Sequence, residues 1–286
     1  MILHKPNSQQ LRRHLWAGMV SIGCCLRGLP LFFQAEPKTP LRVLCLIAFD
    51  TLHVLRTQAP LPRHRVRLLA SFLDFAACTN AALDHKRFCP REYQANRQGI
   101  ETMGISSAVD EYVWRLQELE GQRPPPGGDH RRFDEVRLYR ESVARLSLGT
   151  VAAIALGEKR VADGIRAIDD DYDLATLFRV VMLCQIIDDV LDYADDVSAR
   201  LPSFLTAAAS LSHALTWTAE AARSYAKCPD WPRSAGVFPF RAALFVISVF
   251  TTLLIRTRQW RYRLVWTLRS QEQPEPVRSG CASRNR

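Results

Sequence analysis

A cluster of acidic residues directly after an apolar segment constrains this chain more than any other feature of its sequence. The apolar segment covers residues 174–184, and the run that follows, residues 185–196, reads QIIDDVLDYADD. On a helix, residues three and four positions apart are neighbours. The following polar side chains are therefore expected on one side of a single helix: Gln185, Asp188, Asp189 and Asp192.

Such a cluster needs positive charge nearby, because carboxylates that are packed together repel one another. No Lys or Arg lies between residues 180 and 199, so no ion pair one helical turn away offsets the repulsion. A hard cation can do so, and Mg²⁺ in proteins usually takes one or two carboxylates together with substrate phosphates. The cluster favours a metal–diphosphate site, and a solvated acidic helix face is the alternative.

The rest of the sequence predicts an all-α protein. Apolar residues recur at helical spacing through most long segments, and neither a series of strands nor a glycine-rich phosphate loop is present. Residues 121–128, GQRPPPGG, form the clearest break and predict an exposed loop between two helical halves. We expect one helical domain over residues 1–268 and a polar, basic, disordered tail over residues 269–286.

Composition excludes some classes of function. The net charge is +9, but the residues from position 256 to the end contain eight Arg and two Glu, which leaves only +3 for the body. A body of such low charge argues against nucleic-acid binding. The basic C-terminal part is expected to be solvated, while peripheral membrane contact and a homodimer stay open. The eight cysteines show no C-x-x-C pair and no zinc spacing, which indicates a reducing, cytoplasmic compartment.

Three other segments have structural explanations. Residues 15–25 are apolar after a basic start but lack a clear small-residue cleavage site, so we do not expect a signal peptide. Residues 242–255 are uncharged but shorter than the roughly 20 residues that cross a bilayer, so we expect a buried core helix, with interfacial attachment as the alternative. Residues 169–173, DDDYD, predict the start of the next helix, 174–196, because the helix dipole favours acids there.

The acidic cluster resembles a known family motif. Residues 184–192, CQIIDDVLD, are similar to the second aspartate-rich motif of trans-prenyl diphosphate synthases, F-Q-I-x-D-D-x-L-D, with Cys184 in place of the Phe. Residues 195–202, DDVSARLP, resemble the region after this motif in squalene and phytoene synthases. The chain therefore resembles the class I isoprenoid synthases, which include terpene synthases.

This resemblance implies a single-domain bundle of long helices around a deep apolar cavity, with two acidic motifs facing each other across its mouth. It implies that Asp188, Asp189 and Asp192 bind Mg²⁺, and that the metal holds the diphosphate of a prenyl substrate. Metal ions and basic side chains neutralise the leaving diphosphate. A dry pocket with aromatic walls protects the carbocation that remains.

The partner motif, D-D-x-x-D or D-x-x-x-D, has no match before the Pro-rich break. The best candidate is residues 80–84, NAALD, in which Asn80 and Asp84 are four positions apart as two metal-facing ligands should be. Asp74 is a less well aligned alternative. Ordinary polar residues at a helix end are the competing explanation.

Basic residues that would contact the diphosphate lie on both sides of the cluster. Arg145 sits amid apolar residues of the helix predicted over 133–156, so it needs an anionic partner. That partner is either the diphosphate or a carboxylate, such as Glu141 or one of the Asp residues. The remaining expected contacts are Arg140, Arg200 and Gln185.

The type of reaction is indicated by a missing segment. Chain-elongating prenyltransferases of this family carry a basic G-G-K-R-x-R-P-like segment, whereas residues 63–67, RHRVR, lack the glycines. We therefore expect a Mg²⁺-dependent synthase that cyclises or eliminates from the carbocation of one prenyl diphosphate. A prenyltransferase, by elongation or head-to-head condensation, and a non-catalytic helical family member are the alternatives.

Overall fold

The computed structural model describes residues 12, 15–20, 22–24, 26, 40–83, 89–102, 104–158, 160–227 and 238–272. Every regular element in these residues is a helix, which confirms the predicted all-α class. The named helices are α2 (Pro40–Thr57), α3 (Arg63–Leu83), α4 (Pro90–Thr102), α5 (Ser106–Gly121), α6 (His130–Leu156), α7 (Val161–Asp170), α8 (Tyr172–Leu191), α9 (Tyr193–Ala199), α10 (Leu211–Ala226) and α11 (Phe238–Glu272).

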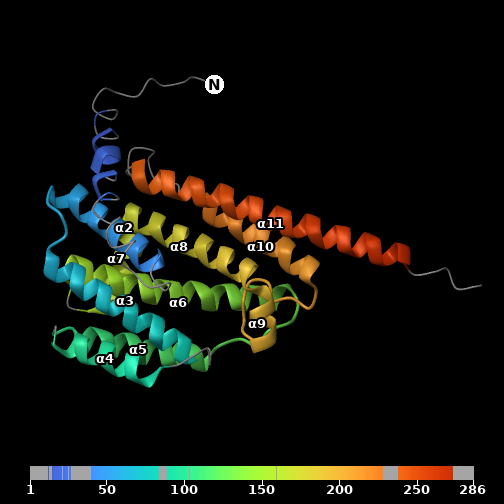
Figure 1. Ribbon diagram of the computed structural model, residues 1–286, viewed down its shortest axis with the longest axis horizontal. Helices are drawn as coiled ribbons and strands as arrows, with labels where there is room; N and C mark the ends of the chain where they lie inside the picture. Colours follow the sequence, from blue (N-terminus) through green and yellow to red (C-terminus); the bar gives the residue numbers. More distant parts are fainter. Residues whose placement is uncertain are drawn as a thin grey trace, which may run out of the picture.

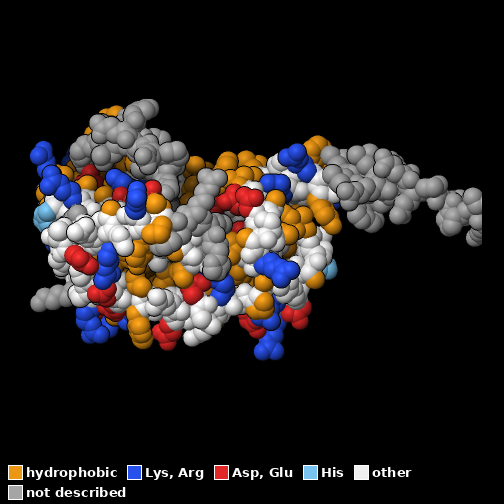
Figure 2. All heavy atoms as spheres, turned by 60° about the horizontal axis from the view of Figure 1, so that its bottom comes forward, with side chains coloured by type: hydrophobic (Ala, Val, Ile, Leu, Met, Phe, Trp, Pro, Cys, Tyr) orange, Lys and Arg blue, Asp and Glu red, His pale blue; other side chains and the backbone are white. Residues whose placement is uncertain are grey.

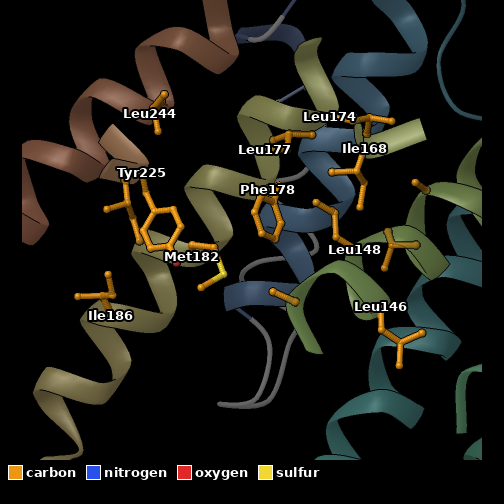
Figure 3. Close-up of a cluster of buried hydrophobic side chains, with 14 of the residues drawn as sticks. Leu146, Leu148, Ile168, Leu174, Leu177, Phe178, Met182, Ile186, Tyr225 and Leu244 are labelled. Carbon is orange, nitrogen blue, oxygen red and sulfur yellow. The ribbon is translucent and has the colours of Figure 1, made fainter. Parts of the chain in front are cut away.

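Helices α6 and α8 form the middle of the bundle. Helix α6 packs against α3, α5, α7 and α8, while α8 also packs against α7, α10 and α11 (Figure 1). In Figure 3, Phe178 and Met182 of α8 lie between Tyr225 and Leu244 on one side and Ile168 on the other. Because α8 has neighbours on several sides, it is apolar around most of its circumference.

Helices α6 and α7 approach each other closely at two glycines. A Cβ atom on Gly164 would lie 2.0 Å from the carbonyl oxygen of Gly149, and one on Gly149 would lie 2.5 Å from Cγ1 of Ile165. Both glycines are buried. The two backbones therefore meet only because neither position carries a side chain.

The helix predicted over residues 174–196 is divided in two. Helix α8 ends at Leu191 and α9 begins at Tyr193, so Asp192 lies at the junction between them. The acidic start of this helix is confirmed, because the Asp171 carboxylate caps α8 by accepting a hydrogen bond of 2.9 Å from the Leu174 amide. The first acids of that group, residues 169 and 170, instead end α7.

A buried loop connects α9 to α10. Residues 201–207 are non-helical and buried, and α10 begins only at Leu211. The Thr206 hydroxyl donates a hydrogen bond of 2.6 Å to the Leu201 carbonyl. The Thr206 carbonyl accepts one of 2.7 Å from the amide of Gly127, in the loop between α5 and α6. The Pro-rich break thus lies against this buried loop.

The core helix predicted over residues 242–255 lies within α11, but only its inner face is buried. Leu244, Thr251 and Ile255 are buried where α11 packs on α8 and α10. Phe245 and Phe250, on the other side, are 69% and 52% exposed, so the expectation of a buried helix is wrong for this face. Helix α11 also continues past the expected boundary at 268 to residue 272, and the remainder of the expected tail lies outside the described residues.

Candidate functional site

The acidic cluster at the α8–α9 junction is split between the surface and the interior. Asp188 and Asp192 are exposed, whereas the side chain of Asp189 is only 3% exposed. The expectation that these carboxylates share one side is therefore wrong for Asp189. Successive residues on a helix differ in direction by about 100°, so Asp189 faces the core when Asp188 faces solvent. Figure 2 shows a group of acidic side chains. Its position along the long axis of the molecule matches that of the α8–α9 junction in Figure 1.

Both oxygens of the Asp189 carboxylate are engaged within the protein. Oδ1 accepts a hydrogen bond of 2.9 Å from Nη2 of Arg140 on α6. Oδ2 accepts one of 2.6 Å from the backbone amide of Phe204 in the buried loop. Asp189 therefore joins three segments, α6, α8 and residues 201–207, at one point.

The electrostatic surroundings of Asp189 are mixed. Burial raises the pKa of the Asp189 carboxyl to about 6, although the positive charge of Arg140 and the Phe204 amide act in the opposite direction. The negative charges of Asp196 and Asp188 raise the pKa of Asp189 further. Asp196 is itself buried. Two buried carboxylates and one guanidinium thus lie beneath the exposed acids.

We expect Asp189 to make the protein less stable as the pH rises from about 4 to about 7. The raised pKa means that the folded protein holds this proton more tightly than the unfolded chain, so its contribution is complete below about pH 4 and is lost as the pH rises through about 6. The full loss is on the order of 3 kcal/mol. Urea unfolding of the parent and of Asp189→Asn across this range measures the effect. A difference between the two proteins that does not change with pH would contradict it.

The dipoles of α8 and α9 have opposite effects on the negative charges of the cluster. Asp195 and Asp196 lie in the first turn of α9, where the positive end of the dipole stabilises negative charge. Asp188 and Asp192 lie at the C-terminal end of α8, where the dipole adds negative potential. These two acids belong to consecutive turns, because the Asp192 amide donates a 2.8 Å hydrogen bond to the Asp188 carbonyl. The position of Asp188 and Asp192 therefore favours a bound cation.

The donor set fits a cation that is shared with a ligand. Within the described part of the chain, no group of three or more His, Cys, Asp or Glu side chains lies close enough together to hold a metal ion. Two exposed carboxylates suit Mg²⁺, which keeps several waters and often takes its remaining ligands from phosphates. Asp188 and Asp192 are the residues that would hold it.

The structure describes only some of the residues that were expected to face the acidic cluster across the cavity mouth. Asn80 is exposed near the end of α3, and Asp84 lies outside the described residues. Arg65, at the start of α3, donates a hydrogen bond to the Ala155 carbonyl, so the start of α3 lies beside the end of α6. Helix α6 lies between α3 and α8 (Figure 1). Asp74 is engaged elsewhere, because both of its oxygens accept hydrogen bonds from Arg42 on α2.

The side chains that were expected to contact the diphosphate do not lie together in the structure. Arg140 lies at the acidic cluster, but Arg145 makes a 2.5 Å ion pair with Asp169 of α7 and lies over the ring of Phe178. A carboxylate partner for Arg145 was one of the expected alternatives. Arg200 is exposed directly after α9 and has a left-handed backbone conformation. The buried Oε1 atom of Gln185 accepts no hydrogen bond from the described residues.

Two hollows occur away from the acidic cluster. One, of about 370 Å³, lies between α10 and α11. The other, of about 340 Å³, lies among α6, α7, α8 and α10 and is lined by Arg137, Glu141, Arg145, Ile168, Asp169, Ala175, Phe178, Arg179, Ser224 and Tyr225. Neither hollow is lined by the acids of the α8–α9 junction. The deep apolar cavity that the family resemblance implies therefore stays a prediction.

Sequence reasoning missed the buried loop and its link to Asp189. Residues 201–207 contain a Pro and two hydroxyl residues, which indicates a break but not burial.

Comparisons of this chain with protein-family models, with curated proteins and with solved structures found no match. The resemblance to class I isoprenoid synthases therefore stays a prediction from residues 184–192 and 195–202.

Proposed function

We propose that this protein is a Mg²⁺-dependent class I isoprenoid synthase that binds a prenyl diphosphate at the α8–α9 junction. The observation that carries the proposal is the exposed pair Asp188 and Asp192 at the C-terminal end of α8. The C-terminal end of the α8 dipole and the two like charges add negative potential at this place. A cation that also binds diphosphate would relieve that repulsion.

The three acids of the motif then have different roles. Asp188 and Asp192 are the metal ligands. Asp189 positions them from below, because its oxygens accept hydrogen bonds from Arg140 and from the Phe204 amide. This division agrees with the usual use of one or two protein carboxylates per Mg²⁺ in sites that bind phosphates.

The chemistry that the site supports is departure of the diphosphate. A bound Mg²⁺ neutralises negative charge that grows on the leaving group. Arg140 adds positive charge beside the acids, where its side chain is 24% exposed and pairs with Asp189. Without the glycine-rich basic segment of the elongating enzymes, cyclisation or elimination from one substrate is the favoured outcome.

A non-catalytic helical protein is the second candidate. It is favoured by the ion pairs that engage both Asp189 and Asp74, which reduce the number of acids available for metal binding. In that case the α8–α9 junction would bind neither Mg²⁺ nor diphosphate with useful affinity.

We expect titration calorimetry to detect binding of inorganic diphosphate only when Mg²⁺ is present. Asp188→Asn with Asp192→Asn should weaken this binding by about tenfold or more, because both metal ligands lose their charge. Asp195→Asn is the matched control, since Asp195 is an exposed neighbour in the first turn of α9, and it should change binding by less than about twofold.

Product analysis separates the candidate functions. The protein is incubated with geranyl, farnesyl or geranylgeranyl diphosphate and Mg²⁺, with and without isopentenyl diphosphate. A hydrocarbon or alcohol from one substrate supports the proposed synthase, while a longer diphosphate indicates a prenyltransferase. Absence of both product and Mg²⁺-dependent binding would establish the non-catalytic alternative.

A further inference from the structure

Within the described part of the chain, the outer face of α11 carries a continuous set of exposed apolar side chains. Large apolar side chains between positions 245 and 253 are 44% to 69% exposed: Phe245, Val246, Val249, Phe250 and Leu253. Their spacing of three and four residues places them along one side of the helix. Exposed apolar patches of this kind on a folded protein mark surfaces that bind a partner or a membrane.

The same side of α11 becomes basic and aromatic towards its C-terminal end. Arg256, Trp260, Arg261 and Arg263 are exposed. Residues 238–271 contain no Asp or Glu, so the charged side chains of this part of α11 are all basic. Trp at the end of an apolar stripe, with Arg beside it, is the arrangement found where proteins meet the polar boundary of a bilayer.

We propose that α11 lies on an anionic lipid bilayer, with Phe245, Phe250 and their neighbours in the acyl boundary and the arginines among the lipid head groups. Anionic head groups complement the positive charge of the exposed arginines. This inference is independent of the proposed function, because it uses no residue of the α8–α9 junction.

A second copy of the chain covers this face less well. In a parallel pairing the arginines of the two α11 helices would face each other, which costs free energy through like-charge repulsion. In an antiparallel pairing they would be buried against the apolar stripe of the partner, where an unpaired charge is strongly disfavoured. A bilayer surface offers apolar and anionic groups at two adjacent depths instead.

A helix lying on the surface agrees better with the packing than a helix that spans the membrane. Residues Pro239–Arg263 are long and apolar enough to cross a bilayer. Their inner face, however, includes Leu244, Thr251 and Ile255, which are buried in the bundle. A spanning arrangement would expose the core that these side chains complete.

A second exposed apolar face strengthens the inference. In the N-terminal segment, Leu15, Met19, Ile22 and Leu26 are 60% to 65% exposed and are spaced by four, three and four residues, as on one face of a helix. This segment and α11 both lie at the upper edge of the molecule in Figure 1. The N-terminal segment therefore offers a second exposed apolar face in addition to that of α11.

Vesicle flotation of the full chain tests this proposal. We use vesicles of phosphatidylcholine alone and vesicles that also contain phosphatidylglycerol. The protein should float with the anionic vesicles, and raising the salt concentration should weaken binding. Phe245→Ser with Phe250→Ser should reduce partitioning by about tenfold or more, because two large apolar side chains leave the lipid boundary. Arg256→Gln with Arg261→Gln should remove most of the preference for anionic lipid.

The matched control is Trp114→Ser with Leu138→Ser, since these side chains are 62% and 65% exposed on α5 and α6. The control should bind vesicles like the parent, and circular dichroism checks that each variant is folded. Failure of the parent to float with anionic vesicles would overturn the proposal. So would equal losses in the control and in the α11 variant. A dimer in light scattering that Phe245→Ser with Phe250→Ser dissociates, without vesicle binding by the parent, would assign the face to a second copy instead.

Discussion

Asp189→Ala should lower the free energy of unfolding by about 3 kcal/mol, the lower end of what is measured when one partner of a buried ion pair is removed. The substitution leaves the Arg140 guanidinium without the carboxylate at 2.9 Å and the buried Phe204 amide without its acceptor at 2.6 Å. A buried donor that loses its acceptor accounts for roughly 1–3 kcal/mol of this. Urea unfolding monitored by circular dichroism at neutral pH measures the change.

Two further variants make the Asp189 result specific. Asp189→Asn retains an oxygen that can accept from the Phe204 amide, so its loss of stability should be smaller than that of Asp189→Ala. Asp195→Ala removes an exposed acid of the same cluster and should change stability by less than about 1 kcal/mol. If Asp189→Ala is no less stable than Asp195→Ala, Asp189 does not hold the buried loop in place.

The raised pKa of Asp189 is consistent with this expected loss. The pKa compares the charged and neutral forms of the same carboxyl, and it rises because burial removes water from the charged form. The substitution instead removes both forms, together with both hydrogen bonds. A buried pair can thus contribute little when both partners are present and still cause a large loss when only one remains.

Gly164→Ala should destabilise the protein by about 3 kcal/mol or more, at the upper end of the range for overpacked cores. The new Cβ atom would lie 2.0 Å from the Gly149 carbonyl oxygen and 2.8 Å from the Ala153 amide nitrogen. These atoms belong to the α6 backbone and cannot move aside as a flexible side chain would. The helices α6 and α7 would have to separate along their whole contact, which equilibrium unfolding would report.

Gly99→Ala is the matched control for this substitution. Gly99 lies within α4, and no atom lies within 4 Å of the place where its Cβ would stand. Since Ala is the better helix former, this variant should be more stable by about 0.5–1 kcal/mol. Equal effects of the two substitutions would show that the α6–α7 approach is looser than the structure indicates.

Local sequence patterns were sufficient for several features. Helical periodicity predicted the all-α class, and the Pro- and Gly-rich residues 121–128 mark the end of α5 and the loop before α6. The acidic group before the apolar segment predicted the start of α8, where Asp171 caps the helix. Each of these features depends on residues within a few positions of one another, so they can be read without knowledge of the fold.

Tertiary structure decided which acid of the cluster faces inward and what it contacts. The partners of Asp189 are 49 and 15 positions away in sequence, on α6 and in a loop whose burial no local pattern indicates. The close approach at Gly149 and Gly164 likewise depends on two helices meeting.

For α11 the sequence by itself determined an apolar helix, and only the packed bundle decided that one face is buried and the other exposed. The physical reason is the same in each case. Periodicity determines which residues share a side of a helix, whereas the neighbours of that side are chosen by packing between segments far apart in the chain.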